Sequence, residues 1–296
     1  MNKTFPPSEL IINEDGSAFH LHIRPEQLAN RVILVGDPDR VSTVASYFDN
    51  IEYDIQSREF HTITGTYQGK RISVLSTGIG CDNIDIVMNE LDALANIDFN
   101  TRTEKDTHQA LTIVRIGTCG GLQPETPIGT FIASVKSIGF DGLLNYYAGR
   151  NDVCDLELED AFTKHMNWSP QKGAPYVAVA NSDHIEQIAG ADMTRGITIA
   201  CGGFYGPQGR QVRLKIQDPE QNKKIESFRY IDPQTHKELK VCNFEMESSA
   251  LAGLSALLGH RAMTCCMVIA NRYAKEMNTE YKNTINTLIQ KVLDRI

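Results

Sequence analysis

Short continuous apolar runs alternate with segments of helical periodicity along this chain, and that alternation constrains the fold more than any other feature. The runs end in glycine or in a polar turn, as do strands that are buried on both faces of a sheet. Strands are expected at residues 31–36, 71–77, 111–117, 131–138, 176–180 and 262–270, and helices at residues 39–48, 82–95, 156–165, 245–258 and 280–296. This order of elements predicts an α/β protein with three layers, α/β/α.

The chain has 296 residues, with no internal repeat and no long linker, so we expect a single domain over residues 1–296. Residues 1–18 are expected to be an N-terminal extension. Residues 96–109 are polar and are expected to form a solvated loop, whereas the charged stretch 217–240 is expected to be a surface helix or hairpin.

The net charge of −8, from 29 basic and 37 acidic residues, argues against a nucleic-acid partner because a negative surface repels phosphate backbones. An anion site would have to be built locally from a few arginines. The seven cysteines are scattered without metal-ligand spacing, which predicts reduced thiols in a cytoplasmic protein. The N-terminus lacks a signal-peptide core, and the longest near-apolar run, residues 262–270, is too short to span a membrane.

Two of the expected strands end in glycine and have a notable arginine close by. In VILVGDPDR, Gly36 lets the backbone approach a ligand, the following helix start favours an anion, and Arg40 adds a charge. The alternative is an ordinary strand-to-helix turn with a surface arginine. In IVRIGTCGG, Arg115 lies inside an apolar strand before an expected glycine-rich turn that contains Thr118. A buried arginine is costly unless it is paired or faces a ligand, and ligands bind at this end of α/β strands.

A third glycine-rich turn, STGIGCDN, lacks the last glycine of the dinucleotide fingerprint, because Gly78 and Gly80 are followed by Asn83. A nicotinamide or flavin cofactor is therefore disfavoured. The sequence also lacks a Gly-x-Ser-x-Gly elbow, so the usual motif of a serine hydrolase is missing.

The segment FYGPQGR offers groups that could recognise a planar heterocycle with an imide edge. Phe204 supplies a flat apolar face, Gln208 a donor and an acceptor, and Arg210 a charged fork. The alternative is a surface turn rich in glycine and proline.

The segment CNFEMESSA places Glu245 and Glu247 on either side of Met246 at an expected strand-to-helix junction. A carboxylate there could accept hydrogen bonds from vicinal hydroxyls. The alternative is a solvated helix N-terminus, where acidic residues are favoured.

Three weaker signals remain. His20 and His22 would share a strand face, but no third metal ligand is evident, so a satisfied or ligand-contacting histidine is the preferred interpretation. Arg58 is expected to start a strand and could form a surface ion pair. Asn271 and Arg272 end an apolar strand, where polar side chains meet ligands, although Arg272 could also be exposed in a loop.

Taken in order, the motifs GDPDR, REF, STGIG, RIGTCGG, FYGPQGR, EMES and NR resemble the signature of the nucleoside phosphorylase-I family, and within it of the uridine phosphorylases. The matches extend over residues 19–272. The resemblance implies a mixed central sheet and the phosphorolysis of uridine to uracil and ribose 1-phosphate, in which phosphate attacks C1′ through an oxocarbenium-like transition state. Phosphate is then a co-substrate, and no metal or organic cofactor is implied.

The resemblance also implies roles for individual residues in a homo-oligomer with shared sites. Phosphate would be bound by Gly36, Arg40, Arg115 and Thr118, with Arg58 from a neighbouring subunit; ribose by Glu245, Met246 and Glu247, with His20 from that neighbour at the 5′-hydroxyl; and uracil by Phe204, Gln208 and Arg210. The catalytic residues would be Arg115, Glu247 and Arg210. Asn271-Arg272 stands where purine-specific relatives carry Ser-Asp, which favours a pyrimidine.

The chain departs from the family pattern at three places. Cys119 stands where relatives usually have Thr or Ser. Asn83 replaces a serine that helps some bacterial members to hold potassium with Glu59 and Ile79, so a potassium site stays open. The loop at residues 96–109 is longer than in the compact bacterial hexamers, which leaves dimer and hexamer as alternatives.

Two rival functions are weighed against phosphorolysis. A nucleosidase that uses water would have no need for the three arginines Arg40, Arg58 and Arg115. A nucleoside-binding protein without activity is disfavoured because phosphate, sugar and base motifs occur together in one chain.

Overall fold

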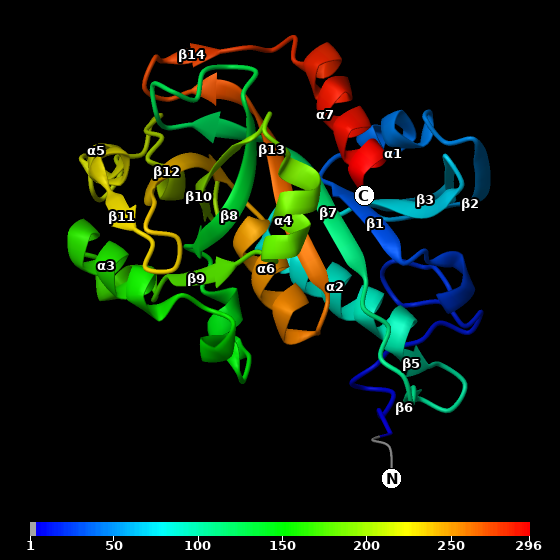
Figure 1. Cartoon of the computed structure of the whole chain (residues 1–296). Coiled ribbons are helices and arrows are strands. Elements are labelled where there is room, and N and C mark those ends of the chain that lie inside the picture. The colour runs from blue at the N-terminus through cyan, green and yellow to red at the C-terminus, as the bar shows by residue number, and fades with distance from the viewer. Residues whose placement is uncertain (1–3) are drawn as a thin grey trace.

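The computed structural model describes residues 4–296 (Figure 1). Of the expected N-terminal extension, residues 1–3 lie outside the described residues. Further along it, Phe5 N–H donates to Arg102 O at 2.8 Å and Arg102 Nε donates to Phe5 O at 2.9 Å. Ser17 and Ala18 are buried, so the last two residues of the extension are part of the packed interior.

The sheet strands and helices have the following bounds. The strands are β1 (Arg31–Val35), β2 (Asn50–Ser57), β3 (Phe60–Tyr67), β4 (Lys70–Ser76), β5 (Ile97–Asp98), β6 (Thr103–Glu104), β7 (Thr112–Gly121), β8 (Phe131–Gly139), β9 (Tyr176–Val179), β10 (Thr194–Ala200), β11 (Arg229–Ile231), β12 (Glu238–Glu245), β13 (Arg261–Asn271) and β14 (Glu276–Met277). The α-helices are α1 (Pro38–Ala45), α2 (Cys81–Asn96), α3 (Leu156–Met166), α4 (Ser182–Ala189), α5 (Gln221–Ser227), α6 (Ser248–Leu257) and α7 (Lys282–Arg295).

One large mixed sheet forms the centre of the molecule, with the order β11-β12-β10-β8-β13-β7-β1-β4-β3-β2. Strands β4, β1, β7 and β13 run parallel, whereas β8 is antiparallel to β13 and β2–β3–β4 form antiparallel hairpins. Strand β12 pairs with β10 and also with β7, where Asn243 lies opposite Gly121. Strands β7, β13, β8, β10 and β12 therefore close into a ring.

Helices cover both faces of the sheet (Figure 1). Val32 and Leu34 of β1 pack in a cluster with α2 and α6, and Ile33 and Val35 pack in a second cluster with α1, α4 and α7. Successive side chains of a strand point to opposite faces, so a strand between two helical layers must be apolar throughout. The expected three-layer α/β/α architecture with a mixed sheet is thus confirmed.

Several local predictions are wrong. The glycine-rich segment after Arg115 is no turn, because β7 continues to Gly121 and pairs with both β12 and β13. The helix expected from residue 245 begins at Ser248, since Glu245 is still paired in β12. His20 and His22 lie in a turn rather than on a strand face, and His22 has a φ of 57°.

Other differences concern the polar segments. Arg58 does not start a strand but lies in the tight turn between β2 and β3, with a φ of 55°. The loop expected at residues 96–109 contains the small β5–β6 hairpin. The stretch 217–240 contains both α5 and part of the β11–β12 hairpin, in keeping with the expected surface helix or hairpin.

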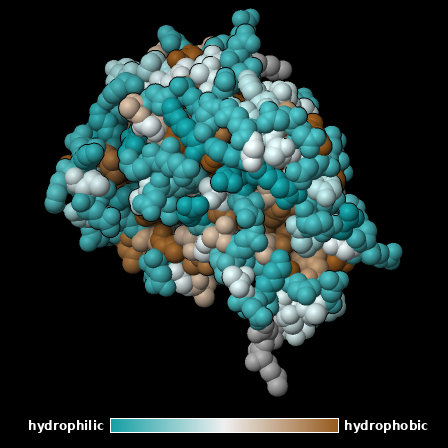
Figure 2. All heavy atoms as spheres, turned by 45° about the vertical axis from the view of Figure 1, so that its right-hand side comes forward, coloured by the Kyte–Doolittle hydropathy of each residue, from teal (hydrophilic) through white to brown (hydrophobic). Residues whose placement is uncertain are grey.

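The face of the molecule in Figure 2 is mostly hydrophilic, and its hydrophobic residues lie in small separate groups. Within residues 4–296, no helix has the length and apolar character needed to cross a bilayer.

Candidate active site

Two glycine turns lie side by side where the parallel strands β1 and β4 end. Gly36 follows β1 and Gly78 follows β4, and a Cβ added at Gly36 would lie 3.4 Å from Gly78 O. Gly78 and Gly80 have φ angles of 70° and 104°, which side-chain-bearing residues rarely adopt. The requirement for glycine here comes from backbone conformation and from the close approach of neighbouring groups.

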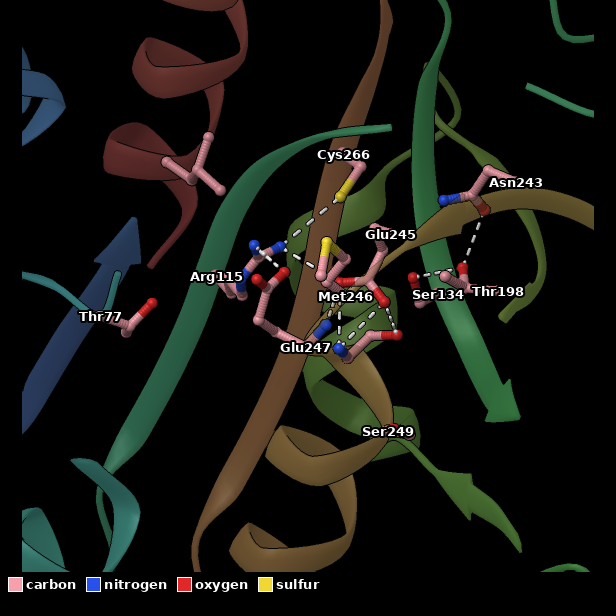
Figure 3. A network of polar contacts seen from close by, with 12 residues as sticks. Thr77, Arg115, Ser134, Thr198, Asn243, Glu245, Met246, Glu247, Ser249 and Cys266 are labelled. Carbon is pink, nitrogen blue, oxygen red and sulfur yellow. Dashed lines mark hydrogen bonds and ion pairs between the residues drawn. The ribbon is translucent and has the colours of Figure 1, made fainter. Parts of the chain in front are cut away.

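Arg115 lies at the centre of a buried charge network (Figure 3). Its Nη1 lies 3.3 Å from Glu245 Oε2, and its Nη2 forms an ion pair with Glu247 Oε2. Burial lowers the pKa of Arg115, but Glu247 and Glu245 outweigh it and the pKa is raised overall. Gly117 makes room for this side chain, because a Cβ there would collide with Arg115 Nη1. The arginine is therefore charged and fixed in place.

Glu245 organises the turn that precedes α6. Its carboxylate accepts hydrogen bonds from Glu247 N–H at 3.0 Å, from Ser248 N–H at 3.0 Å and from Ser248 Oγ at 2.6 Å. Unpaired N–H groups at a helix start favour such an acceptor. Burial raises the pKa of Glu245 to about 7, with Arg115 lowering it and Glu247 raising it. The acceptor sites of Glu245 are thus largely taken by the protein itself.

Glu247 connects two elements across the site. Its Oε1 accepts a hydrogen bond from Gly80 N–H at 2.8 Å, at the start of α2, while Oε2 pairs with Arg115. Met246, between the two glutamates, is half-buried, and its carbonyl oxygen accepts from Cys81 Sγ at 3.1 Å. The EMES turn is therefore held by β7 on one side and by α2 on the other.

Arg40 places a second guanidinium beside Arg115. Its Nη1 donates to Ile116 O on β7 at 3.4 Å. Burial, followed by the charge of Arg115, lowers the pKa of Arg40. Among residues 4–296 Arg40 has no ion-pair partner. Thr118, two residues beyond Ile116 on β7, is half-buried. Arg115 is already paired with two carboxylates, so Arg40 is the guanidinium whose charge an anion bound next to both would stabilise most.

The segment FYGPQGR forms a second cluster. The Arg210 guanidinium stacks 3.7 Å from the centre of the Phe204 ring, and its Nη1 donates to Gln208 Oε1 and, at 2.6 Å, to Phe204 O. Burial, and then Arg272, lower the pKa of Arg210 to about 10. Gln208 is buried, whereas Phe204 is half exposed. The three residues expected at one ligand are therefore in mutual contact.

Arg272 is a further member of this cluster. It is half-buried, its Nη2 donates to Gln208 O at 3.2 Å, and its Nη1 is buried without a hydrogen-bond partner in the described part of the chain. A Cβ at Gly120 of β7 would lie within 4.0 Å of both Arg272 and Arg210. The strand that carries Arg115 therefore leads directly to the FYGPQGR cluster. Asn271, by contrast, is a structural residue that donates to Gln123 O and Thr126 O.

His20 and Arg58 lie together, apart from the Arg115 network. The Phe19 ring is 4.8 Å from the His20 ring and 5.8 Å from Arg58 Cζ. Neither residue hydrogen-bonds to Arg115, Glu247 or Gln208 in the described chain. The structure thus brings together the phosphate, ribose and base residues expected of one chain, and groups separately the two that are expected to serve a neighbour.

Asp92, His108 and His260 form a cluster with the composition of a metal site, outside the region above. Leu111 N–H donates to His260 Nδ1 at 3.1 Å, which leaves the proton of the neutral ring on Nε2. That nitrogen lies 3.2 Å from Asp92 Oδ1. A metal would need the lone pair of Nε2, so the contacts favour a structural Asp–His pair over a metal ligand set.

Asn83 lies at the position considered for potassium. Its Nδ2 donates to Thr77 O at 2.8 Å and to Glu59 Oε1 at 3.3 Å. An amide N–H competes with a cation for the same oxygens, so these contacts of Asn83 weigh against a cation there.

The family model described as the phosphorylase superfamily matches residues 30–296. The chain belongs to the phosphorylase superfamily. It is 31% identical over 278 residues to a uridine phosphorylase of Thermococcus kodakarensis, covering 93% of this chain and 85% of that protein. It is 30% identical over 271 residues to a uridine phosphorylase of Haemophilus influenzae, covering 88% of this chain and 89% of the relative.

The fold of this superfamily member is also similar to that of a solved nucleoside phosphorylase of Trypanosoma brucei, described as showing uridine phosphorylase activity. The TM-score is 0.87 at 28% identity, over 97% of this chain and 100% of that one. The family resemblance inferred from the motifs is therefore confirmed.

Sequence reasoning missed three residues that shape the candidate site. Gly80 was noted only for its spacing, yet its N–H binds Glu247. Glu90 binds the His20 segment from a distance of 70 positions in sequence, which no local pattern reveals. Ser248 donates its N–H and hydroxyl to the Glu245 carboxylate that caps the EMES turn, and the Glu-x-x-Ser spacing is an available signal.

Proposed function

We propose that this protein catalyses the phosphorolysis of uridine, giving uracil and ribose 1-phosphate. The observation that carries the proposal is the pair of guanidiniums, Arg40 and Arg115, beside the glycine turns at the ends of β1 and β4. Such a site fits a small dianion. The names of the relatives from Thermococcus kodakarensis and Haemophilus influenzae support uridine as the nucleoside.

Phosphate would be bound by Arg40 and Arg115, with the backbone at Gly36 and the hydroxyl of Thr118 as further donors. Arg58 of the partner subunit would complete this shell. Holding phosphate below C1′ turns a two-body displacement into a positioned one, which removes much of the entropic barrier.

The ribose would lie against Met246, with its vicinal hydroxyls donating to the carboxylate of Glu247. Because Arg115 and Gly80 already fix that carboxylate, little reorganisation is needed as positive charge develops on the sugar. Glu245 would serve the ribose side indirectly, by accepting Glu247 N–H and holding the turn.

The base would be recognised by Gln208 and Arg210 beside the Phe204 ring. As the glycosidic bond lengthens, negative charge spreads to the uracil carbonyls, where the guanidinium of Arg210 and the amide of Gln208 stabilise it. The leaving anion then needs no dedicated general acid, and the reaction needs no metal or organic cofactor.

We propose in addition that the enzyme works as a cytoplasmic homo-oligomer, with His20 and Arg58 supplied to the neighbouring site. The family resemblance supports this arrangement, and in the described chain neither side chain hydrogen-bonds to Arg115 or Glu247.

The deciding experiment is uracil release from uridine with and without phosphate. We expect release only with phosphate, together with stoichiometric ribose 1-phosphate. Undiminished release without phosphate would instead indicate a water-using nucleosidase, and no release under either condition would indicate a binding protein. Rates with 2′-deoxyuridine, thymidine and inosine would then define the specificity.

A further inference from the structure

Glu90, on the third turn of α2, holds the segment that carries His20. Its Oε1 lies 2.6 Å from His20 Nδ1, and its two oxygens accept the backbone N–H groups of His20 at 3.0 Å and of Leu21 at 2.9 Å. Leu21 is fully buried, and the side chain of Glu90 is only 14% exposed. One carboxylate thus fixes both the backbone and the ring of this segment.

The contact with Glu90 also determines which nitrogen of His20 carries a proton. An ionised carboxylate can only accept hydrogen bonds, so Nδ1 must be the donor. In the neutral ring Nε2 is then an acceptor, and it makes no hydrogen bond within residues 4–296. A carboxylate that sets a histidine tautomer in this way is a common supporting arrangement in functional sites.

Helix α2 contacts Glu247 at its start and the His20 segment further along. Gly80, at the start of this helix, binds Glu247 of the same chain, and Glu90 lies about 15 Å further along, from a rise of 1.5 Å per residue. The ring of His20 is bound at that distant point and is 28% exposed. This supports its use by a neighbouring site.

We infer that Glu90 is a positioning residue, which fixes the Nδ1–H tautomer and the orientation of His20 so that Nε2 accepts a hydrogen bond from the ribose 5′-hydroxyl in the partner subunit's site. The inference rests on the proposed function. It assigns to Glu90 a part in selecting nucleosides with a free 5′-hydroxyl, and no contact with substrate.

The test compares uridine with 5′-deoxyuridine in the phosphorolysis assay. One neutral hydrogen bond corresponds to a preference of about threefold to tenfold in kcat/KM for uridine. Glu90→Gln offers one acceptor oxygen for three donors, and its amide N–H would push the ring proton to Nε2. We expect this variant to lose the preference for uridine, with a much smaller change in its kcat/KM for 5′-deoxyuridine.

Three further variants make the result specific. His20→Ala should lose the same preference, and the double variant should lose no more than His20→Ala alone. Asp85→Asn removes a carboxylate of the same helix that binds the Tyr147 hydroxyl at 2.5 Å, and it should keep the preference. A merely structural role of Glu90 would lower the rates with both nucleosides equally.

The tautomer can also be read without any variant at Glu90. Long-range 1H–15N spectra of the wild-type protein should show a protonated Nδ1 and an unprotonated Nε2, with the signal assigned by its loss in His20→Ala. A proton on Nε2, or a Glu90→Gln enzyme that keeps the wild-type preference, would overturn the inference. If the wild-type protein cleaved neither nucleoside with phosphate, the proposed function itself would fail.

Discussion

At the scale of single residues, Arg115 is expected to contribute both to phosphate binding and to the stability of the fold, and the two contributions can be measured separately. Arg115→Ala removes one of two cations at the proposed phosphate site and leaves Glu245 and Glu247 buried without their partner. We expect phosphorolysis to be lost, and the free energy of unfolding to fall by about 3–5 kcal/mol, the usual effect of breaking a buried ion pair. Initial rates against phosphate concentration and urea unfolding measure the two effects.

Arg150→Ala is the matched control for this prediction. It breaks the ion pair with Glu159 at 2.7 Å, remote from the proposed site. Its stability should fall without any change in the dependence on phosphate. A nearly normal phosphate dependence in Arg115→Ala would refute the assigned role.

A substitution of Arg210 should affect uridine rather than phosphate. Arg210→Ala removes the guanidinium stacked on Phe204 and bonded to Gln208, so the KM for uridine should rise and kcat should fall. The KM for phosphate should stay close to the wild-type value, because Arg210 does not contact Arg40 or Arg115. Unchanged uridine kinetics would disprove the assignment to the base.

The sequence predicts these residues unequally well, for physical reasons. Arg115 is conspicuous because a charge inside an apolar strand is costly without a partner. Gly80 and Glu90 are not, because their partners, Glu247 and His20, lie far away in sequence. Arg272 is ambiguous at the end of a strand until the structure shows its contact with Gln208.

At the scale of elements, the periodicity of apolar residues predicts the helices and strands that bury a regular face, and it misses those that do not. The central strand β1 and helix α2 are predicted within one or two residues of their bounds. Strand β2 is missed although Ile51, Tyr53 and Ile55 alternate with polar residues, an available strand signal, because none of its residues is fully buried. The start of α6 is misplaced because Glu245 pairs with Ala200 of β10, which no local pattern encodes.

The C-terminal turn of helix α7 is held by ion pairs with Asp192, a group that titrates at acidic pH. Asp192 lies 2.5 Å from Lys291 Nζ and 3.0 Å from Arg295 Nη1, and hydrogen bonds from Arg295 and Lys291 lower its pKa below the usual 3.8. A lowered folded pKa stabilises the protein above the unfolded value, and this contribution is lost as the pH falls below about 4. We expect α7 to lose protection before the sheet on acidification.

Hydrogen exchange across pH 7 to pH 3 measures the protection of α7. Asp192→Asn should reduce that protection at pH 7 and flatten its dependence on pH, whereas the exchange of β7 should not change. An α7 that exchanges alike in both proteins at every pH would contradict the proposed fastening.

At the scale of the whole molecule, a negative net charge is compatible with a cationic site because a few arginines gathered at one place are enough to form it. Arg40 and Arg115 lie near each other beside the central strand β7, and Arg58 lies against the Phe19 ring, which also packs on His20. The sum of charges excludes a broad polyanion surface, yet says nothing about a local anion site. Which arginines act at one site depends on how the subunits assemble. Sequence motifs within one chain do not specify that assembly.

Subunit mixing tests that assembly. Arg115→Ala and Arg58→Ala should each be inactive alone, because each removes a phosphate-binding arginine from every site. If Arg58 serves the partner subunit, a mixed pair has one site with both defects and one intact site. Random pairing after equal co-expression should then restore about a quarter of wild-type activity, as an isologous dimer interface requires. If Arg58 served its own chain, every site in every pair would carry a defect, and the mixture would be as inactive as its parts.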